Sequence, residues 1–174
     1  GTINIFTKKG KPGKHQNAIV RASQNNTKDI FYSFDGADEK HNYYVGLNYY
    51  VTDGISAMNN DNENDPYENN SLTANYEYKI SENNIIENSL KFKDSFLKYD
   101  EVTDGRNDTK NSSDNIEANY SLKFINTNNK FKNTFAYSKS ASSRMVTEYD
   151  GREKTYEGFR NMLTYLGEYK FNLD

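Results

Sequence analysis

The sequence predicts an all-β protein of antiparallel strands, each with one apolar and one polar face, that crosses a membrane as a β-barrel. Three observations predict this: apolar and polar residues alternate, long and short polar segments alternate between the strands, and the composition is polar. Hydrophobic residues make up 34% of the 174 residues, whereas a soluble domain usually contains about 45–50%. Disorder is not expected, because 15 tyrosines and 10 phenylalanines are present and disordered chains are poor in aromatic residues.

Three segments, residues 41–52, 72–80 and 115–124, show the alternation most clearly. A period of two places successive side chains on opposite faces of a strand. Their apolar faces consist of Tyr43, Val45, Leu47, Tyr49 and Val51, then Leu72, Ala74, Tyr76, Tyr78 and Ile80, then Ile116, Ala118, Tyr120, Leu122 and Phe124. Their opposite faces carry Glu77, Lys79, Glu117 and Lys123, which we expect mainly to form cross-strand pairs in a hydrated wall, with contact to a plug or a substrate as the alternative.

Weaker copies of the pattern bring the expected total to roughly eight strands. They lie at residues 18–23, 30–35, 86–96, 131–137 and 159–171. The connections differ in length: residues 80–83 and 126–129 are as short as hairpin turns, whereas residues 53–70, 97–113 and 139–154 form long polar segments. We therefore expect the long loops at one end of the sheet and the short turns at the other.

The apolar face decides between a soluble sheet and a membrane barrel. A soluble sheet needs a partner sheet or helices on that face, and the sequence shows no amphipathic helix that could serve. In a membrane barrel the apolar face contacts lipid, the polar face lines the lumen, and a span needs about 9–11 residues. Aromatic residues near strand ends fit the interfacial girdles of such barrels: Tyr43, Tyr49, Tyr76, Tyr78, Phe124, Tyr165, Tyr169 and Phe171.

Other classes of function have little support in the sequence. A net charge of -3 provides no basic surface for nucleic acid. Cysteine is absent, and the two histidines, His15 and His41, form no metal-ligand pattern. No nucleophile turn of the Gly-x-Ser-x-Gly type is present, so we expect no enzymatic activity. No signal peptide or 18-residue apolar run occurs, and the sequence reads as part of a longer protein.

The stretch "GTINIFTKKGKPGK" at the start of the chain adds a family resemblance. Gly1, Ile3, Asn4, Ile5 and Thr7 resemble the last plug strand of TonB-dependent outer-membrane receptors, and "KKGKPGK" resembles the linker to the barrel. The stretch "TDGISA", an acidic loop and "DPYENNSLTANYEYKISENN" follow in the order of the early barrel strands of that family. The whole chain is covered, and it looks most like the vitamin B12 (cobalamin) transporter subgroup.

The resemblance implies a piece of a plugged barrel of about 22 strands. Residues 1–14 would be the end of the plug domain and its linker, and residues 15–174 the N-terminal part of the transmembrane β-barrel. The complete receptor would lie in the bacterial outer membrane, take up cobalamin or a similar scarce nutrient, and contact the TonB complex through a preceding region. Three alternatives remain: a siderophore or haem receptor of the same family, a soluble β-rich binding module, and a self-contained eight-stranded barrel.

The resemblance also implies a calcium site that joins two loops. Glu63, Asp65, Tyr99, Asp100 and Asp108 match family positions that bind calcium. Calcium prefers about six to eight hard oxygen ligands in a flexible arrangement, which carboxylates and carbonyls supply. Acidic, solvated loops without any metal are the alternative interpretation. The sequence departs from the family at Ser56, where an aspartate would be expected, and this departure bears on calcium affinity and on occupancy by a second ion.

Overall fold

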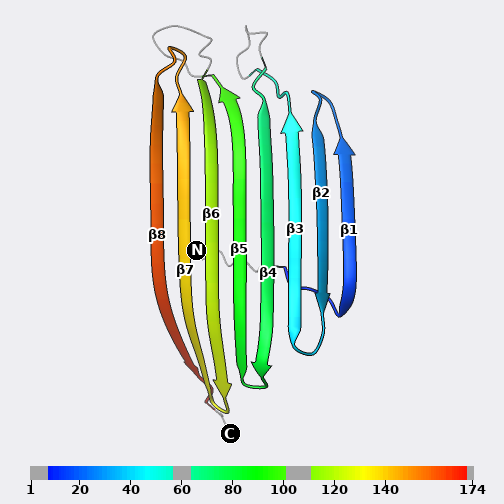
Figure 1. Ribbon diagram of the computed structural model, residues 1–174, viewed down its shortest axis with the longest axis vertical. Coiled ribbons are helices and arrows are strands. Elements are labelled where there is room, and N and C mark those ends of the chain that lie inside the picture. Colours follow the sequence, from blue (N-terminus) through cyan, green and yellow to red (C-terminus); the bar gives the residue numbers. More distant parts are fainter. Residues whose placement is uncertain (1–7, 57–63, 101–110, 172–174) are drawn as a thin grey trace.

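The computed structural model describes residues 8–56, 64–100 and 111–171, and these residues form a single antiparallel sheet of eight strands. Neighbours in sequence are neighbours in the sheet throughout (Figure 1). The strands are β1 (Gly13–Ala22), β2 (Lys28–Ala37), β3 (His41–Thr52), β4 (Tyr67–Ser81), β5 (Asn84–Tyr99), β6 (Asn111–Asn128), β7 (Phe131–Thr147) and β8 (Glu153–Tyr169). The described residues contain no helix, so the predicted all-β antiparallel class is confirmed.

Each of the eight strands overlaps a predicted segment. The prediction of residues 41–52 matches β3 at both ends, whereas most of the other strands extend beyond the predicted segments. The alternation fades in these extensions because polar side chains lie on both faces there. β1 also begins at Gly13, inside the segment 1–14 that was predicted to be plug and linker.

One predicted long loop is wrong. Residues 139–154 mostly continue β7 and begin β8, and only residues 148–152 connect these two strands. The segment "KSASSRMVT" is polar on both faces, so its periodicity was invisible in the sequence. The expected segregation of the connections is nevertheless confirmed by the strand ends that they join. The longer connections follow β1, β3, β5 and β7 at one end of the sheet, the loop end, and the short turns 38–40, 82–83 and 129–130 lie at the other, the turn end (Figure 1).

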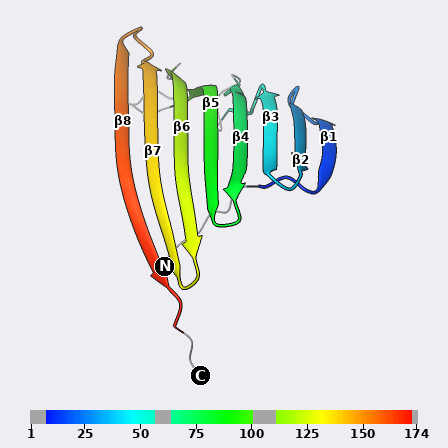
Figure 2. The ribbon, with the colours of Figure 1, turned by 60° about the horizontal axis from the view of Figure 1, so that its bottom comes forward.

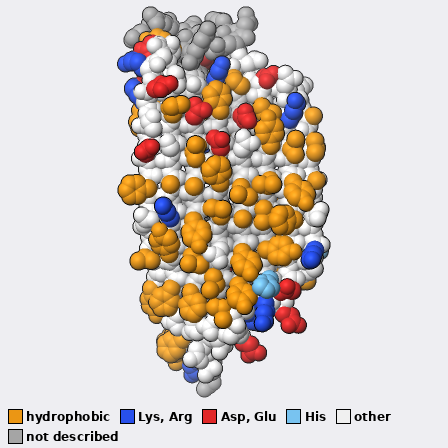
Figure 3. Space-filling view, in the orientation of Figure 1, with side chains coloured by type: hydrophobic (Ala, Val, Ile, Leu, Met, Phe, Trp, Pro, Cys, Tyr) orange, Lys and Arg blue, Asp and Glu red, His pale blue; other side chains and the backbone are white. Residues whose placement is uncertain are grey.

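The apolar side chains of the sheet lie on an exposed face, and the described residues form almost no hydrophobic core. Among the described residues only Tyr44 and Val146 are buried hydrophobic side chains. Side chains such as Phe92, Phe159 and Leu163, with 39%, 83% and 84% of their area exposed, belong to the apolar face. Figure 3 shows this face covered by apolar side chains, with acidic side chains towards the loop end and others at the turn end.

The strands lengthen across the sheet, from 10 residues in β1 and β2 to 18 in β6 and 17 in β8. Figure 2 shows how the turn ends descend progressively from β1 to β8. β1 and β8 are the two edges, and neither pairs with the other. The sheet is therefore open.

Polar side chains determine the tight turns. Asn25, Asn26 and Asn129 adopt positive φ angles of 56°, 52° and 45°, which asparagine tolerates better than most residues. In the turn between β2 and β3, Asp38 Oδ1 accepts hydrogen bonds from the backbone N–H groups of Lys40 (2.9 Å) and His41 (2.8 Å). These bonds lower the pKa of Asp38 below its ordinary value of 3.8.

We expect Asp38→Ala to lower the urea midpoint of unfolding near neutral pH, because both backbone N–H groups lose their acceptor. A lowered pKa in the folded state means that this contribution is present above the unfolded pKa and is lost as pH falls through the folded pKa. The difference between wild type and variant should therefore vanish in acid. Glu39→Ala is the matched control, because it removes a neighbouring carboxylate and leaves both hydrogen bonds in place. Equal midpoints for the two variants at neutral pH would contradict this account.

Candidate functional site

The loop end of β4 and β5 brings together three of the predicted calcium ligands. Asp65 precedes β4, Tyr99 is the last residue of β5, and Asp100 follows it. The N–H of Lys98 donates to the carbonyl of Pro66 (3.0 Å), which extends the β4–β5 pairing by one bond beyond the strand. Asp65 and Asp100 therefore leave adjacent strand ends side by side in the sheet.

The backbone just after β3, at Gly54, approaches the backbone of Asp65 closely. Gly54 has a φ of +70°, and a Cβ atom at this position would lie 2.0 Å from the backbone carbonyl oxygen of Asp65. Only glycine combines this backbone conformation with so close an approach. The two ends of the connection 53–66 are thus held together by their backbones before any side chain is considered.

Buried polar groups surround these acids. Oδ1 of Asp65, Oδ1 of Asn69 and both carboxylate oxygens of Asp100 are shielded from solvent. Asn111, the residue opposite Tyr99 in the β5–β6 pairing, is 2% exposed, and its Oδ1 accepts a hydrogen bond from the N–H of Tyr149 (3.0 Å). Hard oxygen acceptors therefore concentrate at the loop end, and Asn111 links β6 to the connection between β7 and β8.

The structure describes only some of the other positions that the resemblance assigns to the calcium site. Glu63 and Asp108 lie outside the described residues. Ser56 is described and partly exposed, at the position where the family resemblance implies an acid. The described part of the chain contains no group of three or more His, Asp or Glu side chains arranged for a metal ion. Calcium binding by Glu63, Asp65, Tyr99, Asp100 and Asp108 stays a prediction.

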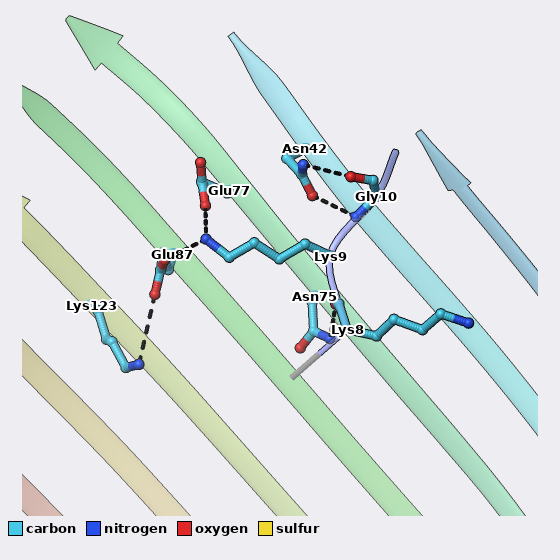
Figure 4. Close-up of polar contacts among 8 residues, drawn as sticks. All are labelled: Lys8, Lys9, Gly10, Asn42, Asn75, Glu77, Glu87 and Lys123. Atoms are coloured by element: carbon cyan, nitrogen blue, oxygen red, sulfur yellow. Dashed lines mark hydrogen bonds and ion pairs between the residues drawn. The ribbon is translucent and has the colours of Figure 1, made fainter. Parts of the chain in front are cut away.

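A second site, which the sequence did not reveal, lies on the polar face of β3, β4 and β5. Here the N-terminal segment, defined as residues 8–11, crosses the sheet (Figure 4). Asn42 holds its backbone twice: Gly10 N–H donates to Asn42 Oδ1 (2.8 Å), and Asn42 Nδ2 donates to the Gly10 carbonyl (3.0 Å). Asn75 Nδ2 donates to the Lys8 carbonyl (3.0 Å), and Ser89 Oγ orients Asn75 by donating to its Oδ1 (2.8 Å).

The charges of this site form a connected set. The ammonium of Lys9 lies 2.5 Å from Glu77 and 3.2 Å from Glu87, and Lys123 lies 3.6 Å from Glu87 on its other side (Figure 4). Burial alone would lower the pKa of Lys9, but the hydrogen bonds and charges of Glu77 and Glu87 outweigh it and raise that pKa above its usual value. The expectation of cross-strand pairs is confirmed for Lys123 with Glu87 and for Glu117 with Lys93, which lie 3.9 Å apart.

A groove of about 490 Å³ adjoins the N-terminal segment on this polar face. Its lining includes Lys9, Lys91, Ser121, Ser138 and Ser140. Each lining residue carries a hydroxyl, amide or charged group, as expected for a surface in contact with water or a polar ligand. The only sequence signal for this site was the basic stretch "KKGKPGK", whose partners could be found only from the strand register.

No protein-family model matches this chain, and no curated protein matches it either. Within the described residues, no helix is long and apolar enough to cross a membrane.

We expect Gly54→Ala to destabilise the protein more than Gly151→Ala does. Both glycines have positive φ, +70° and +80°, so each substitution carries a conformational cost of roughly 1–2 kcal/mol. Only at Gly54 does the new Cβ also meet backbone, because no atom of the described residues lies within 4 Å of a Cβ at Gly151. Urea unfolding of the two variants measures the difference. Equal losses would show that the contact between Gly54 and Asp65 does not constrain the loop.

Proposed function

We propose that this chain is the N-terminal part of the barrel wall of a TonB-dependent outer-membrane receptor that binds and imports cobalamin or a similar scarce nutrient. One observation carries the proposal: the sheet exposes an apolar face, while its polar face is contacted by the segment that precedes β1. A plugged barrel needs this arrangement, because lipid covers the outside of its wall and the plug precedes the wall in sequence and occupies the inside.

The distribution of charge along the apolar face supports a membrane-facing role. The register places Glu68, Asp94 and Asp114 on the same face as the apolar side chains, close to the loop end of β4, β5 and β6. Membrane barrels carry an outward apolar band only about 25 Å tall, whereas 16 residues of β5 at about 3.3 Å each extend roughly twice as far. The charged ends of the strands would project beyond the bilayer on the loop side.

The aromatic side chains near the turn end are arranged as an interfacial girdle would require. Phe131 and Tyr169 contact each other across β7 and β8, with ring centroids 4.8 Å apart, and Phe135 and Tyr165 do the same at 4.9 Å. Tyrosine and phenylalanine at this depth would place apolar rings in lipid and hydroxyl groups near the headgroups. In the same orientation the loop end would face the outside of the cell.

Calcium would organise the loops that receive the nutrient. Asp65 and Asp100 would supply carboxylate oxygens, with Glu63, Tyr99 and Asp108 completing the set. The fit rests on chemistry and burial: carboxylates are the hard ligands that calcium prefers, and three of the four carboxylate oxygens of Asp65 and Asp100 are shielded from solvent at adjacent strand ends. A bound cation would offset the repulsion between these acids and fix both loops over the substrate.

A substitution pair on β6 tests which face contacts lipid. Leu122 lies on the apolar face and is 38% exposed, whereas its neighbour Ser121 points to the polar face. We expect Leu122→Arg to destabilise the intact protein in lipid vesicles by about 2–4 kcal/mol, because an arginine must enter hydrocarbon. Ser121→Arg, the matched control, should have little effect.

Two results would instead favour the soluble binding module. The first is that Leu122→Arg is tolerated, and the second is that the intact protein remains monomeric in buffer without lipid or detergent. Either result would remove the membrane proposal together with the receptor function built on it.

Substrate binding by the intact receptor tests the nutrient and the calcium together. In a panel of cobalamin, haem and ferric siderophores we expect cobalamin to bind most tightly and to lose affinity when calcium is chelated. Asp65→Ala and Asp100→Ala should each weaken calcium binding at least about tenfold, since even the partners of metal ligands contribute this much. Asp150→Ala, in another connection at the same end, is the control.

Two results would separate the parts of this proposal. Equal cobalamin affinity with and without chelator would remove calcium but leave the receptor. Preference for haem or a siderophore would retain the receptor family and replace the substrate.

A further inference from the structure

The sheet contains an unfavourable pair of charges on its polar face. Glu77 on β4 and Glu87 on β5 are direct partners in the strand register, and like charges at directly opposed positions destabilise a sheet. Their side chains are only 25% and 26% exposed, so water screens them incompletely. Lys123 on β6, opposite Glu87 and 3.6 Å from it, balances one of the two charges. One negative charge remains to be compensated.

The compensating charge comes from outside the sheet. Lys9 places its ammonium 2.5 Å from Glu77 and 3.2 Å from Glu87, bridging both carboxylates (Figure 4). It is separated from these residues by 68 and 78 positions in the sequence. Within the sheet, Glu77 and Glu87 carry two negative charges and Lys123 supplies only one positive charge. The two acids therefore form a site for a second cation, which the strand pairing alone does not provide.

We propose that Glu77 and Glu87 form a docking site for a lysine side chain on an extended segment, and that residues 8–11 of this chain are its occupant. This docking site is distinct from the loop end, and the proposal does not depend on which nutrient the protein binds.

The site also recognises the backbone around that lysine. Asn42 pairs with both backbone groups of Gly10, and Asn75 binds the carbonyl of Lys8. A Cβ atom at Gly10 would lie 2.2 Å from the Gly36 carbonyl oxygen and 2.5 Å from that of Tyr43, so only glycine fits at this position. The ammonium of Lys8 lies 5.2 Å from the centroid of the Tyr44 ring, within the range of a cation–π contact. The docking site thus selects a Lys-Lys-Gly sequence in extended form.

Docking of this segment also completes the neighbouring groove. Lys9 is part of the lining of the 490 Å³ groove, together with Glu77, Glu87, Lys91 and Lys123. When the N-terminal segment undocks, Lys9 no longer lines the groove, and the carboxylates of Glu77 and Glu87 become exposed to it. Any polar ligand that contacts Lys9 in this groove must therefore bind in competition or in cooperation with docking, because two events that share a residue are thermodynamically linked.

A double-mutant cycle in the intact protein tests the docking site. Hydrogen exchange at Gly10 and Lys11 provides the readout, because these N–H groups donate to Asn42 and to Asp35 (2.9 Å) only in the docked position. We expect Lys9→Met and Glu77→Gln each to accelerate this exchange by about three- to tenfold, as charged hydrogen bonds at a partly exposed site allow. Added salt should accelerate exchange in the wild type and have less effect in Lys9→Met.

The decisive result is that Glu77→Gln changes the urea midpoint of unfolding in opposite directions in the wild type and in Lys9→Met. In the wild type, Glu77→Gln removes an ion pair and should lower the urea midpoint. In the Lys9→Met background the same substitution removes a like-charge pair and should raise it, with no further change in exchange. Identical effects of Glu77→Gln in both backgrounds would overturn the proposal, because additivity means that the two residues do not interact.

Two further variants keep the test interpretable. Lys11→Met removes the same charge from the same segment but leaves the bridge of Lys9 intact, so its exchange should stay close to that of the wild type. Gly10→Val unseats the segment by steric overlap without changing any charge, and it should reproduce the fast exchange of Lys9→Met. Slow exchange in Gly10→Val, or fast exchange in Lys11→Met, would each contradict docking through Lys9.

Discussion

The structure depends on one constraint, which is that the single sheet exposes an apolar face that no other layer of the described residues covers. Hydrophobic burial normally supplies the main favourable free energy of folding, yet the described residues bury only Tyr44 and Val146 among their hydrophobic side chains. The free energy must come from what covers the apolar face. A lipid bilayer is the environment that we propose, and in it the hydrogen bonding of backbone groups between neighbouring strands becomes the dominant requirement.

The composition of the polar face follows from the same constraint. Its charges are compensated locally, by Lys123 on Glu87 within the sheet and by Lys9 from the N-terminal segment. Small polar residues such as Ser33 and Ser95 take the buried positions there, with 1% and 4% exposure. A wall built in this way can lie beside water, a plug or a polar ligand without exposing apolar surface. The N-terminal segment shows one way in which this wall holds a piece of chain.

The two candidate sites occupy different places on this frame. Backbone constraint shapes the loop end, where Gly54 approaches Asp65 and the β4–β5 pairing brings Asp65 close to Asp100. Charge shapes the docking site, where two opposed glutamates bind one lysine. The loop end suits a divalent cation and a ligand outside the sheet, whereas the docking site suits a segment on the inner face. Four residues after the docked Lys9, at Gly13, the chain enters β1.

The sequence by itself determined the class, the number of strands and the identity of their faces, because a period of two is a local property of each strand. It placed β3 at both ends correctly, and it placed Asp65 and Asp100 in connections between strands, whereas Tyr99, also expected in a loop, is the last residue of β5. The tertiary structure decided the true extent of β7, where "KSASSRMVT" is polar on both faces and periodicity carries no information. It alone paired Glu77 with Glu87 and brought Lys9 to both, since register and the path of a segment across a sheet depend on contacts between residues far apart in the chain.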